Sequence, residues 1–169
     1  MRPVGIVALA VLAAGCGPLG GVRSGAGLCA LVSAPDAEAA LGVAPQAAKV
    51  EDSADHPACD WTGVASEDGR PRTMTAALWR EEALRRKDAT QSGALFFETE
   101  LHALEKDFPR TRVLGGMGDA AVYGFGAIED ERFTGGIIVR KNGDVLSMRI
   151  DGADPAAFEE VARRIAAKM

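Results

Sequence analysis

The two histidines, His56 and His102, are the residues around which acid–base chemistry would have to be built. A Ser–His–Asp triad needs one of them as its base. His56 precedes a proline in a segment without periodicity, and His102 falls on the solvated side of a predicted helix. Glu98 and Glu105 are spaced to join His102 around a metal ion, but a charged solvent face explains the same pattern. We therefore expect no catalytic residue and no metal site, and predict that the chain is not an enzyme.

A second pattern with chemical potential is Gly-Met-Gly-Asp-Ala-Ala at residues 116–121, which fits the form G-x-G-x-x-A. A dinucleotide site requires such a loop to follow a strand and to open a helix. Residues 122–125, Val-Tyr-Gly-Phe, predict a strand instead. We expect a tight glycine turn that leads into this strand, and we expect no cofactor.

Cys16 ends an apolar N-terminal segment, Val4–Gly15, that follows Arg2. These twelve residues are fewer than the ~20 that a membrane-spanning helix needs, which is typical of a targeting segment. The sequence Leu-Ala-Ala-Gly-Cys at residues 12–16 resembles a bacterial lipobox, with Ala13 where leucine is usual. The alternative is an ordinary secretory signal with an incidental cysteine. On the lipobox interpretation, Cys16 carries the lipid that anchors the protein to the extracytoplasmic side of the cell membrane.

Cys29 and Cys59 remain as a pair once Cys16 is assigned to lipid. In an exported protein such a pair favours a disulfide, and closing this loop would contribute about 3–4 kcal/mol of stability. Two alternatives stay open: a metal pair completed by His56, or two free thiols. One histidine and two cysteines make a poor zinc site without a fourth ligand.

The composition is that of a globular protein, with 169 residues, 47% of them hydrophobic and 25% charged. The net charge of −5 argues against a nucleic-acid partner, because binding to phosphates requires clustered positive charge. The predicted organisation has three parts: residues 1–15 form a lipoprotein signal peptide, residues 16–27 form a lipidated and glycine-rich flexible tether, and residues 28–169 form a single α+β domain.

Periodicity and capping residues locate the elements of this domain. A phenylalanine and leucine stripe at residues 97–108 predicts a helix that Pro109 ends, and Ser92-Gly93 separates it from a shorter helix before it. The predicted helices are 33–41, 81–87, a stretch through 108, and 155–169. The predicted strands are 59–64, 72–79 and a strand region that runs from 112 and resumes through 121–125.

The segment from Phe133 to Ile150 is the clearest local signal. Asn142-Gly143 between two β-rich runs predicts a hairpin with a two-residue type I′ turn. This register places Val139 opposite Leu146, Ile137 opposite Met148, Arg140 opposite Val145, Ile138 opposite Ser147 and Gly136 opposite Arg149. The resulting order, α-β-β-α-β-β-β-α, predicts an α+β fold with an antiparallel sheet of about five strands and helices packed on one face.

Several short motifs, taken in order, resemble a family of small lipoproteins with a domain of unknown function found mainly in actinobacteria. The matching motifs are Cys29-Ala-Leu31-Val-Ser33, Asp36-Ala37, Leu41-Gly42, Cys59-Asp-Trp61 and Gly116-Met-Gly118-Asp119-Ala120-Ala121. The family often has Asp-Pro before the first cysteine, where this chain has Gly27-Leu28. The resemblance implies an exported, disulfide-bonded α+β domain with no established activity, and it supplies no catalytic residues.

We therefore expect a non-enzymatic envelope protein, anchored by lipid, that binds a partner protein or a small apolar ligand. A partner would use Arg85-Arg86-Lys87 or the acidic residues 129–131, and a ligand would need a cleft between sheet and helices. The candidate walls of that cleft are the aromatic residues Trp61, Trp79, Phe96 and Tyr123. The alternative hypothesis is an envelope hydrolase that uses Asp, Glu or His for acid–base chemistry on cell-wall or lipid substrates.

Overall fold

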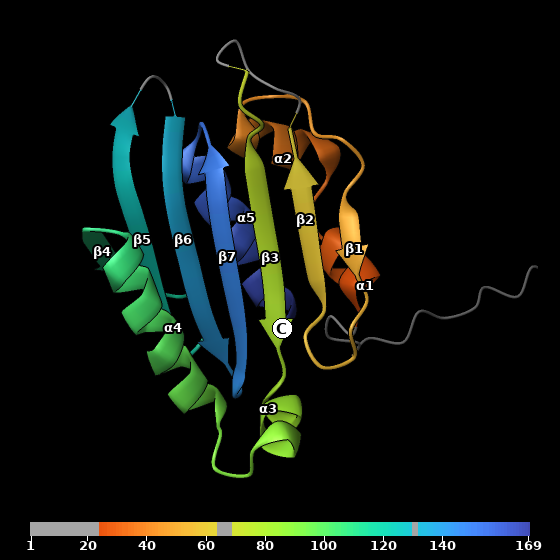
Figure 1. Cartoon of the computed structure of the whole chain (residues 1–169), viewed down its shortest axis with the longest axis vertical. Coiled ribbons are helices and arrows are strands. Elements are labelled where there is room, and N and C mark those ends of the chain that lie inside the picture. The colour runs from red at the N-terminus through yellow and green to blue at the C-terminus, as the bar shows by residue number, and fades with distance from the viewer. Residues whose placement is uncertain (1–23, 64–68, 130–131) are drawn as a thin grey trace, which may run out of the picture.

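The computed structural model describes residues 24–63, 69–129 and 132–169. Within these residues, seven strands form one antiparallel sheet in the order β1-β2-β3-β7-β6-β5-β4, accompanied by five helices (Figure 1). The elements along the chain are α1 (Gly25–Cys29), α2 (Ala34–Leu41), β1 (Lys49–Glu51), β2 (Ala58–Thr62), β3 (Thr73–Trp79), α3 (Glu81–Lys87), α4 (Gly93–Asp107), β4 (Arg110–Val113), β5 (Ala120–Glu129), β6 (Arg132–Lys141), β7 (Asp144–Gly152) and α5 (Pro155–Lys168). The α+β class is confirmed, and the predicted number of about five strands is too low.

Two strands account for the difference in strand number. Strand β1 has three exposed residues, too few to give a periodic signal. The strand region predicted to run from residue 112 and to resume through 121–125, counted as one strand in the predicted order, is two strands, β4 and β5, paired as a hairpin. Between them Gly116 and Gly118 have φ angles of 71° and 65°, which favour glycine. A Cβ atom at Gly118 would lie 2.4 Å from the carbonyl oxygen of Arg140, so the predicted tight glycine turn is confirmed.

The β6–β7 hairpin has the predicted register. All five predicted pairs are present, from Gly136 opposite Arg149 to Arg140 opposite Val145. Asn142 and Gly143 both have positive φ angles, 53° and 86°, as the type I′ turn requires. The side chain of Asp119, from the glycine motif, accepts a hydrogen bond from the Asn142 N–H at 2.8 Å and so ties the two turns together.

Capping side chains start the longer helices at the predicted places. Ser33 and Asp36 form a capping box at α2, and Gly42 ends that helix with a φ angle of 72°. Ser92 caps α4, and the Asp154 carboxylate accepts hydrogen bonds from two backbone N–H groups of α5. These caps satisfy N–H groups that would otherwise lack partners in the first turn.

One face of the sheet packs against α1, α2 and α5, and the main hydrophobic core lies between these layers (Figure 1). Alternate residues of the strands point into this core, as the period of two in a strand requires. The largest fully buried side chains here are Phe133, Phe158, Leu28, Leu41, Met74, Leu78, Ile137, Leu146, Met148 and Ile165.

The opposite face carries α4, which lies in front of β5 and β6 in Figure 1. The prediction that the helices pack on one face is therefore wrong. Ile138 and Val145 point to this second face and are fully buried under Phe97 and Leu104 of α4. The same face also carries Arg140, Ser147 and Arg149, and this mixture of polar and apolar side chains is typical of a solvated face. In the structure α4 covers the apolar residues of that face.

The disulfide between Cys29 and Cys59 is confirmed, with a Cα–Cα distance of 5.4 Å. It joins α1 to β2 and lies in the main core, where Cys59 is fully buried. The two alternatives, a metal pair with His56 and two free thiols, are excluded by this bond.

The predicted signal peptide, the lipidated Cys16 and most of the tether lie outside the described residues. Ser24 caps α1, so residues 25–27 of the predicted tether are helical. No helix in the described part of the chain combines the length and apolar character needed to cross a bilayer.

Candidate functional site

A pocket of about 410 Å³ lies where the loop of residues 52–57, the end of β3 and helix α3 meet. The loop is held against β3 by a hydrogen bond from the Leu78 N–H to the Pro57 carbonyl oxygen at 2.9 Å. Helix α3 starts two residues after β3 ends, so it turns back beside the loop. The residues that line the pocket are Ser53, Asp55, His56, Trp79, Ala83, Leu84, Arg86 and Lys87.

Three aromatic rings contact one another in series at one wall of this pocket. The His56 ring meets Trp79 edge to face, with centroids 4.7 Å apart and an interplanar angle of 82°. The ring of Phe96, from α4, lies tilted against Trp79, with ring centroids 4.8 Å apart. Because Phe96 does not itself line the pocket, it supports the indole ring from the side of α4. Such contacts contribute about 0.5–1.5 kcal/mol each and hold the indole in place.

The imidazole of His56 has a buried nitrogen, Nδ1, with no hydrogen-bond partner among the described residues. The loop that carries it is ordered by its backbone, since the N–H groups of Asp55 and His56 both point to the Ser53 hydroxyl oxygen at 3.3 Å. An unpaired buried polar atom costs about 1–3 kcal/mol, so each one calls for an explanation such as a bound group.

Charged side chains surround the mouth of the pocket. Asp55 from the loop and Arg86 from α3 form an ion pair at 2.6 Å, and both side chains are more than 60% exposed. Lys87 lies next to Arg86 and has no ion-pair partner in the described residues. Trp79, Ala83 and Leu84 give the interior an apolar wall below these charges.

Helix α3 is fixed to its neighbours by two carboxylates that do not line the pocket, those of Asp144 and Glu81. Asp144 accepts hydrogen bonds from the Arg80 guanidinium at 2.6 Å and from the Glu81 N–H at 3.0 Å. Glu81 accepts from Arg85 and from the Gly93 N–H, and these contacts lower the pKa of its carboxyl group. One wall of the pocket is therefore anchored before any ligand arrives.

The structure separates the four aromatic residues predicted to form a cleft. Trp79 and Phe96 come together on the α4 side of the sheet. Trp61 and Tyr123 are buried in the main core on the other face, 3% and 2% exposed. Trp61 also lines a second pocket of about 300 Å³ beside the disulfide, and burial raises the pKa of the Tyr123 phenol above its ordinary value.

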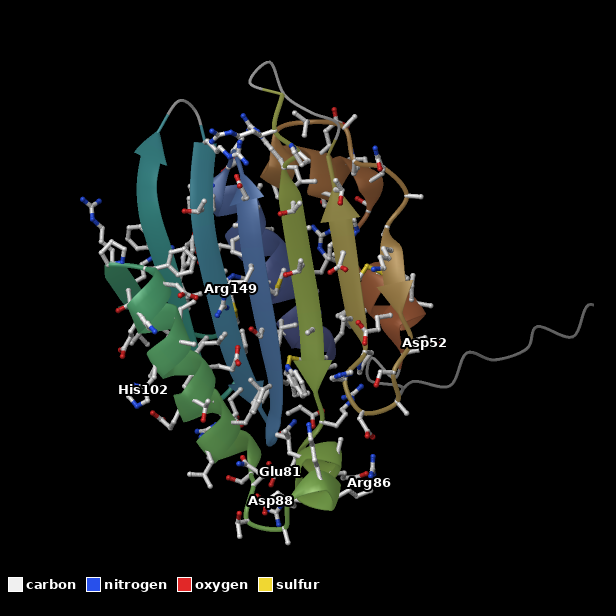
Figure 2. All side chains as sticks on the ribbon, viewed as in Figure 1. Asp52, Glu81, Arg86, Asp88, His102 and Arg149 are labelled. Carbon is white, nitrogen blue, oxygen red and sulfur yellow. A yellow bond between two sulfur atoms is a disulfide. The ribbon has the colours of Figure 1, made fainter. Side chains whose placement is uncertain are left out.

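The residues weighed for acid–base or metal chemistry do not share a site. His102 is 79% exposed on the outer side of α4, with Glu105 3.7 Å from it (Figure 2). His56 lines the pocket described above, where the one carboxylate, Asp55, is paired with Arg86. No group of three or more His, Cys, Asp or Glu side chains in the described ranges could hold a metal ion.

The glycine motif borders a third pocket, of about 350 Å³, near the end of α5. Its polar groups already have partners within the fold. The Lys141 ammonium donates to the carbonyl oxygens of Ala166 and Ala167, and Asp119 accepts from Asn142. The motif therefore positions two turns. Of the predicted acidic surface 129–131, residues 130 and 131 lie outside the described residues, as does the side chain of residue 129.

Several pocket residues were absent from the candidates drawn from sequence. Ser53, Asp55, Ala83 and Leu84 lie in a segment without periodicity or in a short helix, where nothing marks them as neighbours. The sequence pattern indicated His56 only as a catalyst or metal ligand, and Arg86 and Lys87 only as a solvated helix face or a surface for a partner protein. Comparisons of the chain with family models, with curated proteins and with solved structures find no match, so the resemblance to a lipoprotein family stays a prediction.

Proposed function

We propose that this protein is a non-enzymatic, lipid-anchored protein of the cell envelope that binds a small apolar ligand in the His56–Trp79 pocket. The observation that carries this proposal is the combination of an indole wall with a buried imidazole nitrogen that has no partner. Ligand pockets are mostly apolar and aromatic, with a few polar groups that fix the orientation of the ligand. The volume of about 410 Å³ falls in the range typical of such sites.

A small ligand is favoured over a partner protein by the distribution of apolar surface. A stable protein interface buries roughly 800 Å² on each partner and has an apolar centre. The large hydrophobic side chains exposed in the described residues are Val50, Leu95 and Val113, which lie on β1, α4 and β4. They are single residues on separate elements, which is ordinary for a protein surface.

The anchor in this proposal is acylation of Cys16. Several acyl chains, each contributing about 0.8 kcal/mol per buried CH₂, would hold the protein firmly on a membrane. Intact-mass measurement should find a mature chain that begins at an acylated Cys16 and lacks two hydrogens for the Cys29–Cys59 disulfide. A chain cleaved elsewhere and unmodified would remove the anchor from the proposal.

Native mass spectrometry of the full-length protein, gently extracted from its own membranes, tests the pocket. We expect an extra mass of a few hundred daltons on the natural protein. Trp79→Leu should lose this mass, because it removes the indole wall and keeps an apolar side chain against Phe96. Trp61→Phe, on the opposite face of the sheet, should keep it. A bare monomer in all three samples, or a protein-sized addition instead, would contradict ligand binding.

A further inference from the structure

We propose that the ligand is an amphiphilic anion, with a flat apolar body and one carboxylate, sulfonate or phosphate group, and that Asp55 competes with it for Arg86. This inference rests on the proposed ligand-binding function and names the class of ligand. The apolar body would lie against Trp79, and the anionic group would meet Arg86 and Lys87 at the mouth.

The charges at the mouth favour an anion. Among the lining residues, the carboxylate of Asp55 balances one of the two cations, Arg86 or Lys87. Lys87 has no ion pair in the described part of the chain, although the protein as a whole carries a net charge of −5. This local excess of positive charge beside an apolar wall is complementary to an amphiphilic anion.

Two carboxylates near α3, those of Glu81 and Asp88, are engaged away from the mouth of the pocket. Glu81 accepts hydrogen bonds from Arg85 and the Gly93 N–H. Asp88 accepts from the backbone N–H and the hydroxyl of Thr90, at 2.9 and 2.8 Å. Figure 2 shows Glu81, Arg86 and Asp88 together at this end of the molecule. Neither of these two carboxylates therefore pairs with Lys87 at the mouth.

The Asp55–Arg86 ion pair connects the two walls of the pocket. Arg86 pairs with Asp55 on the loop, 31 residues away, and not with Glu82 on its own helix. Exposed ion pairs contribute about 0–1 kcal/mol, so an incoming anion can replace Asp55 at small cost. An anion on an apolar body gains from both the guanidinium and the indole, whereas Asp55 gains only from the guanidinium.

Isothermal titration calorimetry of the detergent-solubilised full-length protein with naphthalene-2-carboxylate and with its neutral amide tests the inference. The two compounds share a flat apolar body and differ in charge. We expect the carboxylate to bind about three- to fivefold more tightly than the amide, which is the upper part of the range that an exposed ion pair contributes. Equal affinity for the two compounds would overturn the inference.

Variants test whether the charges at the mouth of the pocket cause the difference in affinity between the carboxylate and the amide. Arg86→Gln should weaken carboxylate binding about three- to fivefold and leave amide binding unchanged, and Asp55→Asn should strengthen carboxylate binding by freeing Arg86. Arg110→Gln, on β4 at the edge of the sheet, removes the same charge and should change neither. If Arg110→Gln and Arg86→Gln have the same effect, the anion is held by net charge and the inference fails.

The failure of the proposed function gives a different result from the failure of this inference. If both compounds bind equally and Trp79→Leu abolishes both, the pocket binds apolar ligands without selecting an anion. Heats from uptake of the compounds by the detergent are subtracted with a titration of detergent alone. If neither compound then binds, or if Trp79→Leu leaves the binding of both unchanged, the pocket function fails with the inference.

Discussion

Replacing Leu104 by alanine should loosen helix α4 from the sheet. Leu104 is fully buried, and its side chain sits over Gly124 of β5 and Gly136 of β6. These two glycines face each other across the β5–β6 pair and leave a depression that the leucine fills. Truncation of a buried leucine removes apolar contacts and leaves a cavity, which costs about 2–5 kcal/mol.

The glycines make the prediction more specific. A Cβ atom at Gly136 would lie 2.7 Å from a terminal carbon of Leu104, closer than such atoms approach in folded proteins. Gly136→Ala should therefore destabilise the natural protein by about 1–3 kcal/mol through overpacking. When Leu104 is already alanine, the close contact that remains is with the Arg149 side chain, 2.9 Å from the added Cβ at Cδ, and this flexible side chain can shift. The same substitution should therefore cost less.

Urea unfolding of the four proteins in this cycle, followed by circular dichroism, measures the coupling. With a slope of roughly 2 kcal/mol per molar urea, a loss of about 3 kcal/mol in Leu104→Ala moves the midpoint by about 1.5 M. We expect a coupling free energy of at least about 1 kcal/mol between residues 104 and 136. Leu95→Ala, on the same helix but 55% exposed, is the matched control and should cost less than about 0.5 kcal/mol. If the effects at 104 and 136 add within about 0.5 kcal/mol, the described packing of α4 is refuted.

Two further predictions concern cross-links in the fold. Replacing both Cys29 and Cys59 by serine should lower the free energy of unfolding by about 3–4 kcal/mol, measured in urea, and added reductant should then have no further effect. The hydrogen bond from Ser33 and the contact with Arg164 lower the pKa of the Asp36 carboxyl group, so the unfolded state binds more protons as the pH falls. The resulting stability is present above the ordinary aspartate pKa and is lost as the pH falls through the lowered one. Asp36→Asn should therefore be less stable than the natural protein at pH 7, with the difference shrinking toward about pH 3; a constant difference would contradict this assignment.

Much of the fold follows from local signals in the sequence. Asn142-Gly143 adopts the positive φ angles of a type I′ turn, and the turn fixes the register of β6 and β7. Ser33 and Asp154 start helices because their side chains pair with free N–H groups. The pairing of Cys29 with Cys59 follows from the number of cysteines once Cys16 is assigned to lipid. Each of these signals acts through neighbouring residues or through a simple count.

Only part of the candidate site could be predicted from the sequence. Trp79 and Phe96 were named from their residue type, and the structure brings them together. Trp61 and Tyr123 have the same type, yet they fill the core on the other face. An aromatic side chain in a strand or helix does not indicate which layer it will join, because that depends on what is packed against it.

The sequence by itself determined the class of fold, the main hairpin, the helix ends and the disulfide. Only the tertiary structure decided that α4 covers the second face of the sheet, where Gly124 and Gly136 make room for Leu104. It also decided that a loop at residues 52–57 meets α3 over Trp79 to form a pocket. The physical reason is the sequence separation of the residues that interact. Turns and caps depend on a few adjacent residues, whereas the packing of α4 and the shape of the pocket depend on surfaces that exist only after the sheet has formed.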